Sequence, residues 1–438
     1  MATLLFRMKL VPLLVLALVS PLGWVSVNAD ATPVSSPMAS PTAVEDWPTW
    51  IAMGPSDTII ARAVRSSTCP QITVDGSTGS MDIRALPVEG HPNVVCESTV
   101  PAGSTQVSID GQLMPLPVDD PQRIAVLGDT GCRLKAPEHF QACNDPAQWP
   151  FARVASEAAE WDPDLVIHVG DYIYREAPCP SDNAGCAGSP YGDSWSTWSA
   201  DFFEPAGSLL DAAPWIFVRG NHEDCSREGN GWFRYLDPMP LPETCQPITQ
   251  PYALSIGDVQ AVVLDVASAQ DTNPTPDVTD AFKPIFERAL DLAKDKPTWL
   301  LTHRPMWSMG ATSSGAPTEW STATYDQTGF SQQSSAFDLV IAGHVHMTQL
   351  VWFTPESQRA PQLVAGGGGT ELDNFPSGTF DGATLGDPEL EHGWRWRDFG
   401  FMTIQPVDTG YVTGVRLLDG TSPATCLSVG PELTCLPG

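Results

Sequence analysis

Positive charge is scarce in this chain. Its 438 residues contain 22 Lys and Arg against 52 Asp and Glu, which gives a formal net charge of −30. Such a surface repels a phosphate backbone, so we expect no binding to duplex nucleic acid or to an anionic membrane. Long hydrophobic runs are missing too. The most apolar run, Leu10–Val19, is too short to cross a hydrocarbon layer of about 30 Å, so no membrane span is predicted.

Several short motifs are also absent. No Cys-x-x-Cys pair occurs, which argues against a thiolate zinc site. There is no Walker or GxGxxG loop. The run Gly366–Gly369 follows a strand-like segment and precedes neither Lys-Ser/Thr nor a helix, so it predicts a tight loop near the site instead of a nucleotide cradle.

The ten cysteines all lie beyond residue 29, and their even number is typical of an oxidising compartment. Sequence alone does not settle their connectivity. We expect pairing in sequence order: Cys69 with Cys96, Cys132 with Cys143, Cys179 with Cys186, Cys225 with Cys245, and Cys426 with Cys435.

The first 46 residues predict targeting and a linker. Arg7 and Lys9 precede the apolar run, and small residues end at Ala29, as in a secretory signal peptide over residues 1–29. Residues 30–46 are rich in Pro, Ser and Thr and predict a flexible linker. The protein is therefore expected to be secreted or periplasmic.

The rest of the chain divides into two regions with different sequence patterns. Over residues 47–120, short β-type runs alternate with turn signals, which predicts a small all-β sandwich domain. Over residues 121–438, apolar runs alternate with helical patterns at Trp149–Trp161 and Thr279–Lys294, which predicts an α/β domain. Five of these runs have the character of strands buried on both faces: Ile124–Leu127, Leu165–Val169, Trp215–Val218, Trp299–Thr302 and Leu339–Ala342.

A hydrophilic cluster follows each of these five runs. In order they are Gly128-Asp129-Thr130-Gly131, Gly170-Asp171-Tyr172-Ile173-Tyr174, Gly220-Asn221-His222-Glu223, His303-Arg304-Pro305 and Gly343-His344-Val345-His346. Taken singly, such a Gly-Asp pair is usually a turn and a lone His usually structural. Together at strand ends they predict one crevice. Carboxylates, an amide, a phenol and imidazoles suit iron, manganese or zinc, in numbers sufficient for two ions sharing a carboxylate.

This order of motifs, GDxG, GDxxY, GNH(D/E), H and GHxH, resembles the calcineurin-like metallophosphoesterase superfamily and, within it, the purple acid phosphatase branch. The resemblance covers roughly residues 123–405. Most of the superfamily has DxH in the first motif, whereas this chain has Asp129-Thr130-Gly131 and supplies Tyr174. In the purple enzymes that tyrosine is a phenolate ligand to ferric iron. The implied fold is a four-layer αββα sandwich, preceded here by the small β-sandwich domain.

The resemblance also implies roles for individual residues. A ferric ion would be held by Asp129, Asp171, Tyr174 and His346. A divalent iron, zinc or manganese ion would be held by Asp171, Asn221, His303 and His344. His222 would protonate the leaving group or orient the phosphate, with Glu223 on its other ring nitrogen. Arg304 is a candidate phosphate contact, with a structural salt bridge as the alternative.

The implied activity is that of a phosphoric ester hydrolase acting on phosphomonoesters through attack of a metal-bound hydroxide. One alternative is a phosphodiesterase or nucleotidase using the same ions. Another is a site like that of the iron and calcium alkaline phosphatases, which share a GDYIY-like segment. From a different class, the chain is a non-catalytic binding protein whose metals only hold the fold. The natural substrate and the oligomeric state stay open at this point.

Overall fold

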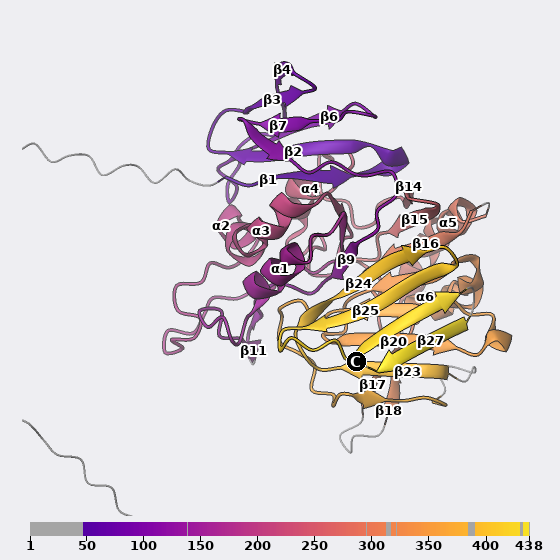
Figure 1. Ribbon diagram of the computed structural model, residues 1–438. Coiled ribbons are helices and arrows are strands. Elements are labelled where there is room, and N and C mark those ends of the chain that lie inside the picture. The colour runs from indigo at the N-terminus through magenta and orange to yellow at the C-terminus, as the bar shows by residue number, and fades with distance from the viewer. Residues whose placement is uncertain are drawn as a thin grey trace, which may run out of the picture. The chain divides into compact units, whose positions relative to one another are not determined.

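The computed structural model describes residues 47–137, 139–294, 296–311, 317–320, 322–383, 390–429 and 432–437 (Figure 1). The expected signal peptide and linker lie outside these residues. Within the described part of the chain, no helix is long and apolar enough to cross a membrane.

Two large sheets form the centre of the described chain. The first has eleven strands, in the order β27 (Glu432–Pro437), β26 (Ala424–Val429), β25 (Gly410–Leu417), β24 (Gly400–Val407), β9 (Ile124–Leu127), β12 (Leu165–His168), β13 (Trp215–Phe217), β1 (Thr49–Met53), β2 (Ile59–Arg65), β6 (Val94–Val100) and β5 (Asp82–Ala85). The second has eight strands, in the order β14 (Tyr252–Ile256), β15 (Val259–Leu264), β16 (Thr298–Thr302), β19 (Leu339–Ala342), β21 (Gln362–Ala365), β20 (Thr348–Phe353), β23 (Leu390–Trp396) and β22 (Gly378–Thr379).

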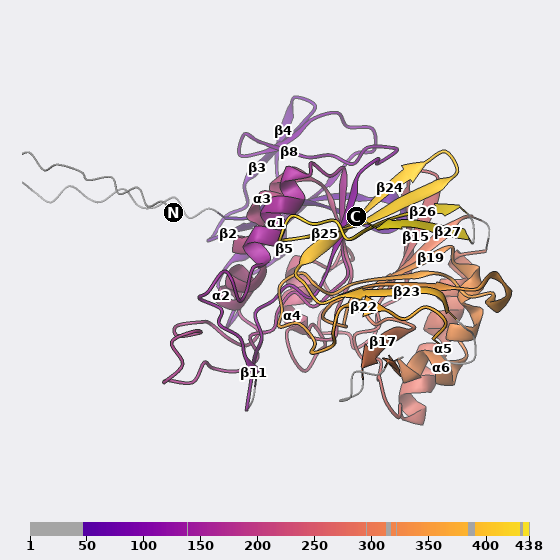
Figure 2. The same ribbon diagram turned by 60° about the horizontal axis from the view of Figure 1, so that its bottom comes forward.

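Three apolar cores separate four layers. Ile167 and Ile216 of the first sheet share one core with Leu301 and Ile341 of the second. A second core lies between the first sheet and helices α1 (Phe151–Glu160) and α3 (Glu204–Ala212). A third joins the second sheet to α5 (Pro276–Leu292) and α6 (Ala323–Thr328). Figure 2 shows the two helical layers on opposite sides of the sheets. The predicted αββα fold is confirmed.

The predicted strands and crossover helices are all present. Helix α1 buries Phe151, Val154, Ala155 and Ala158, one face at helical spacing, against the first sheet. Strands β9, β12 and β13 run parallel, as do β15, β16, β19 and β21 in the other sheet. Parallel strands place their carboxyl ends on one edge, which is what brings the motifs together.

The region from Thr49 to Met114 contains eight strands joined by turns and loops and no α-helix, so the expected small all-β region is confirmed. Four of its strands, β3 (Gln71–Val74), β4 (Ser77–Ser80), β7 (Val107–Ile109) and β8 (Gln112–Met114), form a separate sheet. The other four extend the first large sheet, where β1 pairs in parallel with β13. The region thus shares a sheet with the rest of the chain, and the domain boundary at residues 120 and 121 stays a prediction.

The disulfides join the cysteines in sequence order, as expected: Cys69–Cys96, Cys132–Cys143, Cys179–Cys186, Cys225–Cys245 and Cys426–Cys435. The remaining elements are short. They are β10 (Leu134–Lys135), β11 (His139–Phe140), β17 (Ser308–Ala311), β18 (Pro317–Trp320), α2 (Trp195–Trp198), α4 (Gly229–Tyr235), a π-helical turn at Ser199–Phe203, and 3-10 turns at Pro55–Asp57, Ser331–Ala336 and Pro355–Ser357.

Candidate metal centre

The five predicted motifs meet where the carboxyl ends of the two sheets face each other. Strands β9, β12 and β13 lead into Asp129, Asp171 and Asn221. Strands β16 and β19 of the other sheet lead into His303 and the pair His344 and His346. The contacts below show that all seven candidate ligands, including Tyr174, lie in one cluster.

One group, which we call the tyrosine set, consists of Asp129, Tyr174 and His346. The Tyr174 hydroxyl oxygen lies 3.0 Å from Oδ1 of Asp129 and 2.8 Å from Nε2 of His346. It also donates to Oδ2 of Asp171 at 2.6 Å, so the phenol touches every ligand that the family resemblance assigns to the ferric ion. Tyr174 and Asp129 are buried.

A second group, the amide set, consists of Asn221, His303 and His344. Nε2 of His303 lies 3.1 Å from Oδ1 of Asn221 and 3.2 Å from Oδ2 of Asp171. Asp171, His303 and His344 each offer a donor atom, and these three atoms lie within 4.8 Å of one another. Because Oδ2 of Asp171 contacts both Tyr174 and His303, this carboxylate stands between the two sets.

The backbone is strained at three of these ligands. Asp129, Asp171 and His344 adopt φ values of 56°, 59° and 70°, in the left-handed region that residues with a Cβ rarely occupy. Each is the residue that follows the glycine at the end of its strand. Strain of this kind persists only where the surroundings fix it, and it clusters at functional sites.

The charges of the site call for a cation. Burial and the neighbouring Asp171 carboxylate raise the pKa of Asp129 well above its usual range. Burial, followed by the Asp129 and Asp171 carboxylates, raises the pKa of Tyr174 well above 10. For Asp171, burial acts in the same direction, but the His303 and His222 imidazoles hold its pKa well below the usual range. Metal ions neutralise such a group of buried oxygens, so the donors fit the metals that the sequence predicts.

The second ring nitrogen of each candidate histidine ligand is already engaged. Nδ1 of His303 lies 2.7 Å from the carbonyl oxygen of Val169, and Nδ1 of His346 lies 2.9 Å from that of Glu371. Nε2 of His344 lies 3.1 Å from Oδ2 of Asp271. For His303 and His346 these outer contacts fix the tautomer and turn Nε2 toward the other candidate ligands.

His222 lies at the edge of the cluster. Its ring centre is 3.9 Å from that of Tyr174, and its Nε2 is 3.9 Å from Oδ2 of Asp171. The prediction that Glu223 contacts the other ring nitrogen of His222 was wrong. Nδ1 lies 2.7 Å from Oε1 of Glu176, whereas Glu223 is buried and accepts the backbone N–H groups of residues 171, 172, 173 and 220. Four N–H groups converge on Glu223 because the two loops turn around it.

Arg304 is engaged within the protein. Its guanidinium pairs with Asp271, donates from Nε to the carbonyl oxygen of Val266 at 3.3 Å, and lies 3.1 Å from Nε2 of His344. The salt bridge that the sequence left as an alternative to phosphate contact is therefore formed. Burial acts to raise the pKa of Asp271, but His344 and Arg304 lower it, so Asp271 stays charged beside the imidazole.

Sequence reasoning missed two carboxylates, Asp271 and Glu176. Asp271 follows β15, an apolar run that was not counted among the five although it lies parallel to β16. If this run is counted as a sixth strand, the polar residues that follow it become candidates, and Asp271 is among them. Glu176 lies two residues beyond Tyr174, so it leaves the second motif on the same side as the phenol. Its position is visible in the sequence only once that segment is known to be extended.

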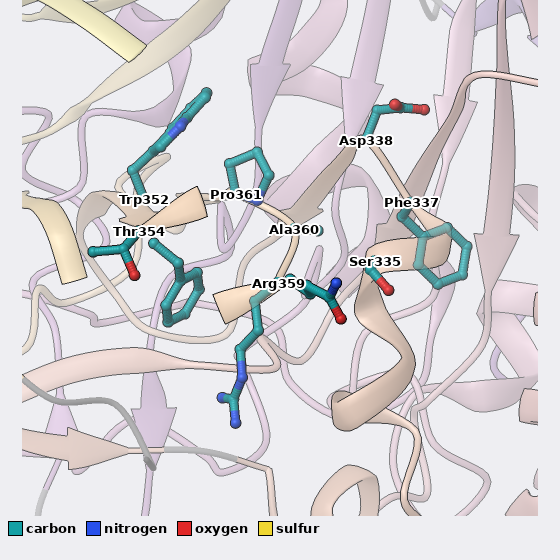
Figure 3. Close-up of a pocket in the computed structure, with 10 residues that line it drawn as sticks. Ser335, Phe337, Asp338, Trp352, Thr354, Arg359, Ala360 and Pro361 are labelled. Carbon is teal, nitrogen blue, oxygen red and sulfur yellow. The ribbon is translucent and has the colours of Figure 1, made fainter. Parts of the chain in front are cut away.

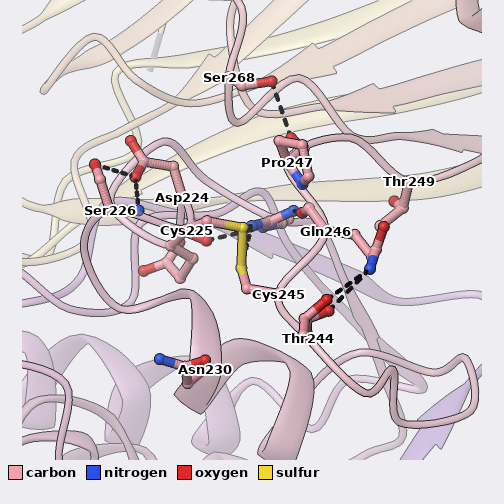
Figure 4. The surroundings of a disulfide bond; sticks show 12 residues. Asp224, Cys225, Ser226, Asn230, Thr244, Cys245, Gln246, Pro247, Thr249 and Ser268 are labelled. Atoms are coloured by element: carbon pink, nitrogen blue, oxygen red, sulfur yellow. Dashed lines mark hydrogen bonds between the residues drawn. A yellow bond between two sulfur atoms is a disulfide. The ribbon is translucent and has the colours of Figure 1, made fainter.

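Two surrounding loops hold the cluster in place. A side chain at Gly220 would place its Cβ 2.1 Å from Oδ1 of Asp171, and one at Gly368 would place it 2.3 Å from the carbonyl oxygen of Gly128. The glycine run is thus a tight loop packed against the first motif, as predicted. The third motif is fastened by the Cys225–Cys245 disulfide shown in Figure 4, which ties the segment after Glu223 to the segment before β14.

Several buried rings lie outside the centre. His168 and Tyr172 stack at 4.0 Å beneath the first sheet. Trp198, Phe202 and Phe203 are buried in the core on the same side of that sheet. A pocket of about 250 Å³, lined by Asp338, Trp352 and Arg359 among others, is shown in Figure 3. Asp338 precedes β19 whereas His344 follows it, so this pocket lies at the far end of that strand.

Comparison with known proteins agrees with this geometry. Residues 122–348 match the sequence profile of the calcineurin-like phosphoesterase family. The chain is similar to the structure of purple acid phosphatase PPD1 from yellow lupin (Lupinus luteus) seeds, with a TM-score of 0.55 and 15% identity over 85% of this chain and 72% of that one. It is also similar to the structure of PhoD, with a TM-score of 0.58 and 12% identity over 89% and 91%. No curated protein sequence matches. At these identities the structural likeness shows the fold.

Proposed function

The chain belongs to the calcineurin-like phosphoesterase family and is a phosphoric ester hydrolase, and from that premise we propose that it hydrolyses phosphomonoesters at a dinuclear metal centre. The observation that carries the proposal is the position of Asp171 between two complete donor sets. Its Oδ2 atom lies 2.6 Å from the Tyr174 hydroxyl and 3.2 Å from Nε2 of His303. A carboxylate in that position suits two ions that share a ligand.

The two sets would hold different ions. Three oxygen donors and one imidazole, from the tyrosine set and Asp171, suit a trivalent ion such as ferric iron. The amide set with Asp171 offers two oxygens and two imidazoles, which suits divalent iron, zinc or manganese. When bound, such ions activate water and neutralise charge on the phosphoryl group.

The remaining steps fall to the chain itself. His222 is 7% exposed and stands over the Tyr174 ring, so it is placed to meet the leaving-group oxygen and give it a proton. Glu176 lies 2.7 Å from Nδ1 of His222 and so orients the ring, and Arg227 lies 3.3 Å from the same carboxylate oxygen. The strained ligand residues keep the donors in place before substrate arrives.

The deciding experiment begins with the colour of the protein. We expect the purified, oxidised protein to show a visible charge-transfer band that Tyr174→Phe removes, with iron plus one divalent ion by metal analysis. A colourless protein with two zinc or manganese ions contradicts the ferric assignment and leaves the hydrolase. The buffers contain no thiol. A His392→Gln variant, which is changed outside the centre, serves as the control.

Substrate class is tested on the same preparation. We expect 4-nitrophenyl phosphate to be hydrolysed with a higher kcat/KM than bis(4-nitrophenyl) phosphate. The reverse order favours the phosphodiesterase alternative on the same ions. Metal-replete protein that hydrolyses neither ester contradicts the proposed catalysis and favours the non-catalytic alternative.

Export to an oxidising compartment is part of the proposal. It is supported by five disulfides, since such bonds persist outside the reducing cytosol. We expect the mature protein, recovered from the periplasm or the medium of its producing cell, to begin near residue 30. Recovery from the cytosol with an intact first residue and free thiols contradicts this.

A further inference from the structure

A small hairpin borders the tyrosine set. It consists of β10 and β11 with the residues beside them, 132–137 and 139–143, and we call it the basic hairpin. It carries Arg133 just before its first strand and Lys135 at the end of that strand, in a chain whose other lysines beyond residue 46 all lie between 283 and 296. Because cations are rare in this protein, two within three residues at the edge of the metal centre are a marked local excess.

Arg133 has no carboxylate partner within the described residues. Its NH1 atom lies 3.4 Å from Nδ1 of His346, but that nitrogen is 2.9 Å from the carbonyl oxygen of Glu371 and therefore carries a proton directed at Glu371. The Nε atom of Arg133 is buried without a hydrogen-bond acceptor in the described chain. A guanidinium with free donors suits phosphate oxygens, which bind it in a fork. Arg304, by contrast, forms an ion pair with Asp271 and donates from Nε to the carbonyl oxygen of Val266.

Lys135 is the last residue of β10 and lies two residues beyond Arg133, which stands just before that strand and accepts the N–H of Gln141 on its carbonyl oxygen. Residues i and i+2 stand roughly 6–7 Å apart where the backbone is extended. Lys135 is half-buried and pairs with no acidic group closely enough to form an ion pair in the described structure, although its charge acts on Glu176. The two cations thus offer two neighbouring anion contacts, the first beside His346 and the second two residues along the chain.

The basic hairpin is held firmly against the metal centre. The Cys132–Cys143 disulfide closes its base, and Leu134 donates its N–H to the carbonyl oxygen of Tyr174 at 2.9 Å. The Gln141 side chain accepts from the N–H groups of Arg133 and Glu371 and donates to the carbonyl oxygen of Gly369. Cation positions fixed in this way before binding lower the ordering cost of a ligand.

We propose that the basic hairpin is a second phosphate-binding element, which makes the preferred substrates esters with two phosphate groups on neighbouring carbons. Arg133 contacts the phosphoryl group that is removed, and Lys135 contacts the phosphate that remains. The contact of Arg133 with the departing phosphoryl group rests on the proposed phosphatase activity. The proposal goes further because it assigns the substrate class and the residues that select it.

The experiment compares ethylene glycol bisphosphate with ethylene glycol monophosphate, which differ only in the second phosphate. We expect the wild type to hydrolyse the bisphosphate with kcat/KM at least about 10-fold higher, beyond the twofold expected from two equivalent groups. Lys135→Gln should reduce the ratio of the two kcat/KM values to about twofold, and Lys135→Arg should keep the wild-type ratio. Lys296→Gln, an exposed lysine before β16, is the matched control. Arg133→Gln should slow both substrates, with Arg153→Gln as its control.

A binding measurement separates this inference from the activity. Calorimetry with methylphosphonate and ethylene-1,2-bisphosphonate, neither of which is hydrolysed, should give a preference for the bisphosphonate that Lys135→Gln abolishes at unchanged metal content. An equal preference in wild type and Lys135→Gln, or none in the wild type, overturns the hairpin assignment even when monoesters are hydrolysed. Absence of all hydrolysis with the bisphosphonate preference intact overturns the proposed function and leaves the anion site.

Discussion

The tyrosine set and the amide set differ in how their charge is balanced. Asp129 and Tyr174 place acidic oxygens against one another, and burial raises the pKa of both. The amide set replaces an acidic oxygen with the neutral amide of Asn221, and its histidines are supported by Val169 and Asp271 from behind. One half of the centre is therefore built for more positive charge than the other. This difference is what the proposed pair of unlike ions rests on.

The largest effect is expected from the residue common to both sets. Asp171→Asn removes one negative charge from the position between them, so both ions should bind more weakly. We expect kcat/KM to fall by more than about 100-fold, beyond the range typical of residues that only orient a ligand. Metal analysis after gel filtration should show the loss of both ions. Loss of one ion alone would mean that Asp171 belongs to a single set.

The second change separates the two sets. Asp271→Asn removes the charged partner of His344 and should weaken the divalent ion by about 10–100-fold while leaving the colour of the tyrosine set unchanged. Titration of metal-depleted protein with zinc, followed by activity and by the visible spectrum, measures both. Asp258→Asn, an exposed aspartate after β14, is the matched control. A change in colour without a change in zinc affinity contradicts the assignment.

A smaller effect is expected at His222. Glu176→Gln keeps the shape of the partner but removes its charge, so the ring is held less firmly and kcat should fall by about 10-fold. KM and the bound metals should stay as in the wild type, because Glu176 belongs to neither set. The corresponding change at Glu223 should instead lower the stability, since that carboxylate accepts four backbone N–H groups. Equal kinetic effects of the two variants would contradict the assignment of Glu176 as the carboxylate that orients His222.

Asp237, a buried acid outside both donor sets, is the reference against which their carboxylates are compared. Burial, opposed by Arg84 and Arg62, raises the pKa of Asp237 to about 6. A carboxyl whose pKa is higher in the folded state stabilises the fold below its unfolded pKa, and this stabilisation is lost as the pH rises through about 6. Compared with Asp237→Asn, the wild type should lose up to about 3 kcal/mol of unfolding free energy between pH 4 and 7. Denaturant unfolding across this range measures the difference, and activity should not change. A constant difference contradicts it.

Much of this centre was predictable because its residues follow strands. The apolar runs before Asp129, Asp171, Asn221, His303 and His344 are short, buried and separated by helices, so the carboxyl ends of parallel neighbours fall at one edge of each sheet. The disulfides were predictable for a similar reason, since each closes a short local loop. The motifs do not predict where a side chain points after the backbone turns. Glu223 was expected to contact the ring of His222, but its carboxylate faces backbone N–H groups instead.

The contacts that were missed come from segments without a motif. Asp271 reaches His344 from a loop 73 residues earlier in the chain, and Gln141 joins the basic hairpin to the glycine run across more than 200 residues. Pairings of this kind depend on how the two sheets are stacked. A single sequence contains no local pattern that reports the stacking. The parallel pairing of β1 with β13 escaped prediction for the same reason.

That pairing has a consequence for attempts to prepare a minimal enzyme. Strand β13, which leads into Asn221, has β12 on one side and β1 on the other, and β1 is contributed by the region before residue 120. A chain started at residue 121 would present β13 as a bare, apolar sheet edge and would leave the carbonyl groups of Tyr235 and Asp237 without the Arg62 guanidinium that now binds them. Open edges of this kind recruit strands from other molecules. Truncation at the apparent domain border is therefore a route to aggregates, and expression trials should keep the chain from Trp47 onward intact.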